Sequence, residues 1–251
     1  MKIKRFDDSW LYNTPVAHRG LYDENFPENT APAFEEAIRL GYGIEMDVQM
    51  TTDNVLVVYH DNNLKRVCGI DKDIRDLSYE EVKTLRPCGK EYPILTFREF
   101  LDLVDGKVPL IIEVKHQKRK GIIEKLVVDE LKNYKGNFSV QSFNPQIVYR
   151  VSKLAPEFVI GVLVTREPSP LAPWIINKLI HRFAFRFYIK FNYLGLRVQD
   201  LPVCHKRSKK FKVVAWTIKT EEEIKIAEKY AQNIIFEKDV PTLSKFGEKK
   251  W

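Results

Sequence analysis

The stretch TPVAHRGLYDENFPENTAPAFEEAIRLGYGIEMDVQMT (residues 14–51) contains a complete strand–helix–strand unit. The short runs Thr14–Gly20 and Gly43–Thr51 are largely apolar, which is typical of buried strands. Between them, apolar residues recur at helical spacing over Glu28–Leu40, and Gly41 is suited to end that helix. Two strands joined by one helix indicate neighbouring parallel strands, so this stretch predicts a β/α architecture.

The same alternation continues along the chain and predicts about eight strands with helices between most of them. Further strands or extended segments are predicted at Val55–His60, Pro109–Lys115, Phe138–Phe143, Val159–Thr165, Tyr188–Tyr193, Val213–Ile218 and Asn233–Glu237. Helices are predicted at Gly121–Tyr134 and Glu221–Tyr230, and the pattern also repeats over Val148–Leu154. A single (β/α)8 TIM barrel of the α/β class fits both the strand count and the length of 251 residues. An open doubly wound sheet is the alternative, but no glycine-rich phosphate loop follows the first strand.

We expect one domain over residues 1–251, because no segment resembles a linker, a low-complexity tract or a second domain. Two segments depart from the plain repeat. Residues 62–92 are polar and lie between strand-like stretches, so they are predicted to form a small insertion after the second strand. Residues 171–191 are aromatic, apolar and basic. We interpret them as the fifth helix and sixth strand packed in the core, with a basic amphipathic contact to an anionic membrane as the alternative.

The composition, with 44% hydrophobic and 30% charged residues, is that of a soluble globular protein. A net charge of +7 favours an anionic partner, which is a phosphate substrate, a membrane surface or nucleic acid. Nucleic acid is not expected, because aromatic residues do not interleave with the basic run at 206–210. The sequence lacks an N-terminal signal segment and any apolar run of about 18–20 residues, so we expect a cytoplasmic protein that contacts a membrane peripherally at most. No feature predicts the oligomeric state.

Three carboxylates are predicted to meet at the mouth of the barrel, because catalytic groups sit at the C-terminal ends of barrel strands. Glu45 and Asp47 share one face of the second strand, and Glu113 shares a face with Lys115 at the end of the third. Carboxylates this close repel one another unless a cation lies among them, and oxygen ligands favour Mg²⁺ or Ca²⁺. The alternative is a structural ion network in which Glu45 pairs with Lys115 and Glu113 with Arg19.

Two histidines lie near these acids in the predicted barrel. His18 ends the first strand, and His60 ends the extended segment after the second. A lone histidine is usually a satisfied polar residue, but two of them at strand ends beside carboxylates favour acid–base chemistry. We therefore predict that His18 and His60 transfer protons near neutral pH.

The motifs VAHRG (16–20), PENT (27–30) and EMDVQ (45–49) resemble the opening signature of the glycerophosphodiester phosphodiesterase family. Further ordered matches are His60-Asp61 with Leu64 and Arg66, Pro93-Ile94-Leu95, Ile112-Glu113-Val114-Lys115, Gln141-Ser142-Phe143 and Ala215-Trp216-Thr217. The chain departs from the family pattern at IIFEKDVP (234–241), where Phe236 replaces a small polar residue. The resemblance implies a TIM barrel that hydrolyses glycerophosphodiesters to sn-glycerol 3-phosphate and an alcohol with the help of one divalent cation.

The resemblance also implies roles for individual residues. It implies two catalytic histidines and three metal ligands, namely His18 and His60, and Glu45, Asp47 and Glu113. It implies phosphate contacts from Arg19 and Lys115 and a glycerol contact from Trp216. Glu28 is expected to support the site or to begin a helix.

Several points of function stay open at this stage. We hypothesise that His60 is the base and His18 the acid, and that the nucleophile is either water or the glycerol hydroxyl of the substrate. One alternative function is a lysophospholipase D-like hydrolysis of a lipid phosphodiester at a membrane surface. The other is a non-catalytic barrel that binds phosphate or lipid.

Overall fold

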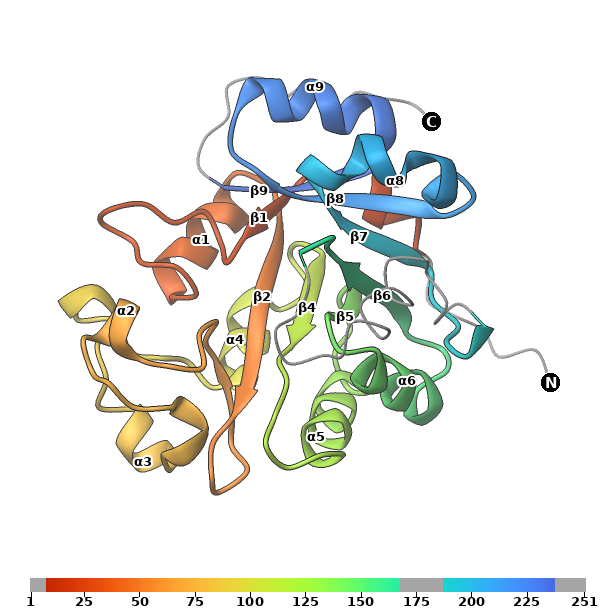
Figure 1. The fold of residues 1–251 in the computed structure, drawn as a ribbon. Coiled ribbons are helices and arrows are strands. Elements are labelled where there is room, and N and C mark those ends of the chain that lie inside the picture. The colour runs from red at the N-terminus through yellow and green to blue at the C-terminus, as the bar shows by residue number, and fades with distance from the viewer. Residues whose placement is uncertain (1–7, 168–186, 238–251) are drawn as a thin grey trace. The chain divides into compact units, whose positions relative to one another are not determined.

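The computed structural model describes residues 8–167 and 187–237, which belong to two compact units (Figure 1). The first unit is Val16–Phe138, and the second combines Met1–Pro15 with Ser139–Trp251. Both units alternate strands and helices, as the sequence predicts.

The first unit contains three parallel strands. Its longer elements are β1 (Val16–His18), α1 (Ala31–Arg39), β2 (Gly43–Met50), α4 (Phe97–Val104), β4 (Leu110–Val114) and α5 (Ile122–Leu131). β2 lies between β1 and β4 and pairs with both in parallel. All eight residues of β2 are buried, so this central strand is a rigid support for any side chain that it carries.

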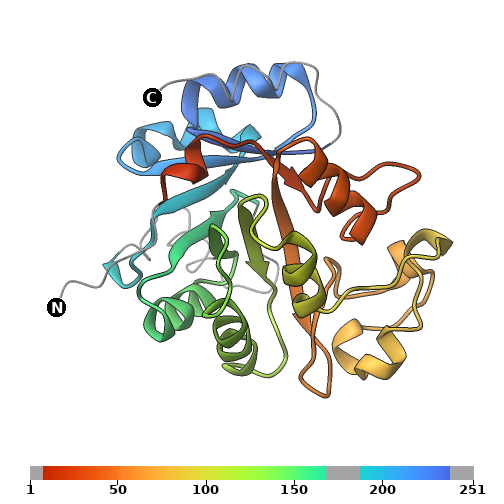
Figure 2. The same ribbon diagram turned by 180° about the vertical axis from the view of Figure 1, so that it is seen from behind.

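The helices of the first unit begin and end where local chemistry requires. Thr96 and Glu99 form a reciprocal capping box at the start of α4. Gly41, which follows α1, adopts a φ of +73°, a backbone conformation that suits glycine. α1 and α4 lie side by side (Figure 2), with the Phe34 and Phe100 rings in an edge-to-face contact at 4.7 Å.

The second unit contributes five parallel strands, each paired with the next along the chain. They are β5 (Phe138–Ser142), β6 (Val159–Val164), β7 (Tyr193–Arg197), β8 (Lys212–Ile218) and β9 (Asn233–Phe236). The described helices among them are α6 (Pro145–Leu154), α8 (Leu201–Ser208) and α9 (Glu221–Tyr230). Eight parallel strands alternating with helices give the chain the topology of a (β/α)8 TIM barrel, which confirms the predicted fold class.

Two predicted strands are wrong in detail. The strand expected at Tyr188–Tyr193 is β7, which begins only at Tyr193. Tyr188, the first residue of the predicted strand, is 79% exposed, and the preceding Phe187 is 73% exposed, so their side chains do not pack in a sheet. The segment at Val55–His60 does contain a strand, β3 (Leu56–Val58), but it runs antiparallel to β2 and is no strand of the barrel.

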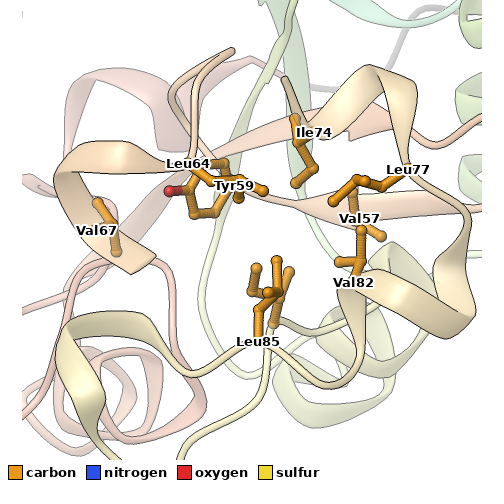
Figure 3. Packing of buried hydrophobic residues seen from close by; sticks show 9 residues of the cluster. Val57, Tyr59, Leu64, Val67, Ile74, Leu77, Val82 and Leu85 are labelled. Atoms are coloured by element: carbon orange, nitrogen blue, oxygen red, sulfur yellow. The ribbon is translucent and has the colours of Figure 1, made fainter. Parts of the chain in front are cut away.

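The predicted insertion at residues 62–92 is present and has a hydrophobic core of its own (Figure 3). It consists of the short helices α2 (Lys65–Cys68) and α3 (Tyr79–Val82) and the 3₁₀ turns η2 (Ile74–Asp76) and η3 (Pro87–Gly89). The buried cluster joins insertion residues to neighbours on and beside β3, namely Val57, Tyr59, Leu64, Val67, Ile74, Leu77, Val82, Leu85 and Ile94. The insertion is therefore packed against β3 and is not a solvent-exposed polar loop.

The segment at residues 171–191 lies outside the described residues except for its end from Phe187 onward. Its predicted membrane contact therefore stays a prediction. Among the helices of the described ranges, none has the length and apolar character needed to cross a membrane.

Candidate active site

Three carboxylates come together at strands β2 and β4 of the first unit. Glu45 and Asp47 are alternate residues of β2 and so point to the same side of the strand. Asp47 lies in register with Glu113 on the parallel neighbour β4. Carboxylate oxygens of the three residues all lie within 4.8 Å of one another, and the residues are 1%, 0% and 7% exposed. The alternation of side chains along β2 and the register of β2 with β4 therefore bring the three acids together.

The acids differ in how readily they ionise. Burial, followed by repulsion from Asp47 and Glu113, raises the pKa of Glu45 well above its usual value. Burial also raises the pKa of Glu113, against the opposing effect of Lys115. Burial acts in the same direction on Asp47, but Lys115 and other nearby basic groups outweigh it and lower the pKa of Asp47. Asp47 is therefore the acid of the cluster that ionises most readily.

The donor set fits a hard divalent cation. All three ligands would be carboxylate oxygens, which such ions prefer, and a positive charge among them would relieve their repulsion. Asn29 supports the cluster, because its Nδ2 donates a hydrogen bond to Asp47 Oδ2 over 3.0 Å. Asn29 Oδ1, on the same amide, is buried and accepts no hydrogen bond within the described ranges. The site thus has one further unsatisfied oxygen beside its acids.

Two cationic side chains adjoin the carboxylates. Lys115 Nζ lies 2.6 Å from Glu113 Oε1 and 2.9 Å from Asp47 Oδ1. Arg19 Nη1 lies 2.7 Å from Glu28 Oε1, and Arg19 Nε lies 3.5 Å from Asp47 Oδ2. Burial lowers the pKa of Lys115, but the two acids beside it outweigh burial and raise the pKa above its usual value, so Lys115 is charged at neutral pH. These partners differ from the structural network considered above, which paired Lys115 with Glu45 and Arg19 with Glu113.

Both histidines lie against acidic residues. His18 is in register with Glu45 of β2, and its Nε2 lies 3.8 Å from Glu45 Oε2. His60 Nδ1 lies 2.5 Å from Asp61 Oδ1. Burial lowers the pKa of His60, although Asp47 and the bonded Asp61 act in the opposite direction. The His60 imidazole is therefore mostly neutral at pH 7.

Seven of the eight predicted site residues thus lie in one cluster of the first unit, and Trp216 is the eighth. Trp216 belongs to β8 in the second unit, where its ring meets that of Phe143 edge to face at 5.3 Å. Its predicted contact with glycerol stays a prediction.

Gln49 is a site residue to which the sequence analysis assigned no role. It is fully buried on β2, and it shares a strand face with the two acids of that strand. Its Nε2 lies 3.3, 3.1 and 2.6 Å from the carbonyl oxygens of Tyr59, His60 and Asp61. Gln49 therefore holds the main chain that carries His60. The spacing of two residues between Asp47 and Gln49, which places both on one strand face, is the signal in the sequence that could have identified Gln49.

Arg66 and Glu28 form a second group without an assigned catalytic role. Arg66 donates to both oxygens of Glu28 and to Asp61, over 2.6–2.8 Å. Burial raises the pKa of Glu28, but the hydrogen bond from Arg66 and the charge of Arg19 outweigh it and hold the pKa below its usual value. Glu28 thus remains ionised between two guanidinium groups and does not itself lie in the carboxylate cluster.

Known proteins resemble this chain over most of its length. Residues 18–240 match the model of the glycerophosphoryl diester phosphodiesterase family. A glycerophosphodiester phosphodiesterase of Caldanaerobacter subterraneus subsp. tengcongensis is 32% identical over 91% of this chain and 95% of its own length. Both the match to the family and the identity of this relative therefore extend over nearly the whole chain.

Solved structures show the same fold. The crystal structure of a glycerophosphodiester phosphodiesterase from Thermotoga maritima has a TM-score of 0.69 and 26% identity, covering 89% of this chain and 94% of that one. A phosphodiesterase from Oleispira antarctica, solved in complex with its product sn-glycerol-3-phosphate, has a TM-score of 0.71 and 23% identity, covering 89% and 92%. With the family match over residues 18–240 and the barrel topology, these likenesses show that this chain is an enzyme belonging to the glycerophosphoryl diester phosphodiesterase family.

Proposed function

We propose that this chain hydrolyses glycerophosphodiesters to sn-glycerol 3-phosphate and an alcohol, with Mg²⁺ or Ca²⁺ as its cofactor and two histidines as acid and base. The observation that carries the proposal is one cluster in the first unit where buried acids, two cations and two histidines lie together. Its members are His18, Arg19, Glu45, Asp47, His60, Glu113 and Lys115.

Glu45, Asp47 and Glu113 are the residues that would hold the cation. When bound, a divalent cation there would supply positive charge to a non-bridging phosphate oxygen. The all-oxygen donor set is the reason for proposing Mg²⁺ or Ca²⁺ over zinc, which prefers nitrogen and sulfur ligands.

Arg19 and Lys115 would bind the phosphodiester anion. Both are charged, and both already lie against the carboxylates of the site. Arg19 offers a planar fork that can contact two phosphate oxygens at once. Lys115 would stabilise the negative charge that develops on the phosphoryl oxygens in the transition state.

His60 would act as the base and His18 as the acid. The lowered pKa of His60 keeps its imidazole neutral near pH 7, as a proton acceptor must be. His18, whose Nε2 lies 3.8 Å from Glu45 Oε2, would give a proton to the leaving alkoxide. The nucleophile is either water or the glycerol hydroxyl of the substrate.

The relatives support this choice of substrate. The Caldanaerobacter relative is named a glycerophosphodiester phosphodiesterase, and the Oleispira structure holds sn-glycerol-3-phosphate as its product. A cytoplasmic location and a peripheral membrane contact through residues 171–191 are further parts of the proposal, and neither is needed for the chemistry.

The test is release of glycerol 3-phosphate from glycerophosphocholine by the purified protein. The assay runs with EDTA, then with Mg²⁺ or Ca²⁺ restored, with His18→Ala as the control variant. We expect release that requires the cation and is abolished by the substitution. Absence of release with either cation would refute the proposal, and a second assay with lysophospholipid vesicles would then separate a lipid phosphodiesterase from a binding protein.

A further inference from the structure

The guanidinium group of Arg66 connects two ionic arms of the site. Its Nε donates to Asp61 Oδ2 over 2.6 Å. Its Nη1 and Nη2 donate to Glu28 Oε2 and Oε1 over 2.8 and 2.7 Å. All three nitrogens of Arg66 are thus engaged with protein carboxylates. This leaves Arg66 poorly suited to grip a substrate phosphate, but well suited to hold other residues in place.

The first arm leads from Asp61 to His60. The two oxygens of Asp61 are divided between two partners, with Oδ2 on Arg66 and Oδ1 on His60 Nδ1. A carboxylate at Nδ1 places the ring proton on that nitrogen, so Nε2 carries the lone pair. Because Arg66 fixes the plane of the Asp61 carboxylate, it also fixes the direction in which His60 Nε2 points.

The second arm leads from Glu28 to Arg19. Glu28 Oε1 accepts from Arg19 Nη1 over 2.7 Å as well as from Arg66 Nη2. The Glu28 side chain is 12% exposed and that of Arg66 is 51% exposed, so the carboxylate is shielded while the Arg66 side of the ion pair faces solvent. Glu28 therefore lies between two arginines. Arg66 fixes the Glu28 carboxylate, and that carboxylate in turn positions Arg19.

The insertion delivers Arg66 to this place. Arg66 belongs to α2, and the flanking residues Leu64 and Val67 are 0% and 5% exposed in the small hydrophobic core (Figure 3). These two anchors fix the backbone on either side of Arg66. The core of the insertion thus fixes the Cα position of Arg66. Among the described residues, Arg66 is the one whose side chain bonds to both Asp61 and Glu28.

We propose that Arg66 is a positioning residue. It aligns the proton-transferring His60 through Asp61 and the phosphate-binding Arg19 through Glu28. We call Arg66 with these two carboxylates the Arg66 bracket. The inference rests on the proposed function for the roles of His60 and Arg19, but the contacts themselves do not depend on it. The bracket gives residues 62–92 a part in catalysis without any contact to the reacting atoms.

The test compares Arg66→Met and Arg66→Lys with Lys65→Met, a matched control. Lys65 is the neighbouring residue on the same helix, and its ion pair with Asp71 joins side chains that are 70% and 68% exposed. With glycerophosphocholine and a saturating cation, we expect Arg66→Met to lower kcat by about 10- to 100-fold and to change KM less than kcat, because misplaced catalytic groups cost turnover. Arg66→Lys keeps the charge but cannot bridge two carboxylates, so it should recover only part of kcat. Lys65→Met should match the wild type.

A second measurement does not depend on turnover. The His60 Nδ1 proton, assigned with a His60→Gln variant, is followed by NMR in the presence of EDTA. A signal shifted downfield by the bond to Asp61 is expected in the wild type and in Lys65→Met, and it should move or exchange away in Arg66→Met. An unchanged His60 signal together with kcat within about twofold of the wild type would overturn the proposal. If the wild type itself released no glycerol 3-phosphate, the proposed function would fail, and the NMR comparison would still decide whether the bracket aligns His60.

Discussion

Replacing Glu45 with glutamine removes the most strongly disfavoured charge from the carboxylate cluster while keeping the size and shape of the side chain. We expect this change to stabilise the protein in EDTA and to abolish its stabilisation by Mg²⁺ or Ca²⁺. The reason is that burial and the neighbouring Asp47 and Glu113 raise the pKa of Glu45, so the folded state without a cation cannot easily keep this residue ionised.

The size of the effect follows from the geometry. Oxygens of two carboxylates separated by 4.8 Å repel by about 3.5 kcal/mol at an effective dielectric constant of about 20. Glu45 has two such neighbours, and Arg19 and Lys115 offset only part of the repulsion. Glu45 can escape by binding a proton, which for a group of usual pKa 4.5 costs at most about 3.4 kcal/mol at pH 7. We therefore expect Glu45→Gln to gain about 1–3 kcal/mol, or roughly 2–12 °C in Tm.

The pH dependence of this gain has a definite sign. A carboxyl group whose pKa is raised in the folded state binds more protons there than in the unfolded state, so it destabilises the protein increasingly as pH rises above 4.5. The advantage of Glu45→Gln over the wild type should thus be largest near neutral pH. It should shrink as pH falls toward 4.5, because the carboxyl group is then protonated in both states.

The assay is thermal unfolding followed by circular dichroism, in EDTA and at saturating Mg²⁺ or Ca²⁺. A ligand at about 100 times its Kd stabilises the wild type by about 2.7 kcal/mol, whereas the variant has lost a ligand oxygen and should respond little. The order of the two Tm values should therefore reverse between the two conditions if the substitution gains less than about 2.7 kcal/mol, and the gap should narrow in any case. Glu124→Gln is the control, because Glu124 is a buried acid of α5 outside the cluster and its loss should leave the response to cations intact. A Glu45→Gln protein that is less stable than the wild type in EDTA at pH 7, or one that gains as much from the cation, would refute this reasoning.

Three further predictions concern the support of His60 in the first unit and the packing of strands in the second unit. Asp61→Asn should move the acid limb of the kcat/KM profile to lower pH, because Asp61 raises the pKa of His60 and its loss lowers that pKa further. An unmoved limb in a pH–rate series would exclude His60 as the base. Gln49→Leu should cost about 1–3 kcal/mol of stability and about tenfold in kcat, since the main chain at His60 loses its buried hydrogen-bond donor. Urea unfolding measures the stability and steady-state kinetics measure kcat, and unchanged values would contradict the role given to Gln49. Gly161→Ala should lower stability by about 1–3 kcal/mol, because the new Cβ would lie 2.2 Å from Cζ of the buried Tyr193 ring. A Tm equal to that of the wild type would show that the ring moves aside without cost.

The convergence of the acids could be predicted from the sequence because it depends on local rules. Alternate residues of one strand share a face, which placed Glu45 beside Asp47. Parallel neighbours bring their C-terminal ends to one edge, which placed Glu113 in register with Asp47. The expectation that residues 1–251 form one domain is of another kind and stays a prediction.

The partners of the charged residues could not be predicted in the same way. Arg66 and Glu28 are 38 positions apart, and they meet only because the insertion folds around its own core. The start of β7 was misplaced for a related reason. Apolar letters such as Phe187 and Tyr188 indicate burial only on average, and here both side chains are largely exposed.

Two kinds of support thus hold the charged groups of this site. The carboxylates project from β2 and β4, whose residues are buried throughout, so the packed main chain fixes them. Arg66 reaches the site on a long side chain, and ion pairs fix its direction. Its three hydrogen bonds go to Glu28 and Asp61 and not to the acids on those strands. Cation binding should therefore depend on the strands, and alignment of His60 on the insertion. It follows that Arg66→Met should keep the cation-dependent rise in Tm even where it lowers turnover, whereas loss of that rise would mean that the Arg66 bracket and the carboxylate cluster act as one unit.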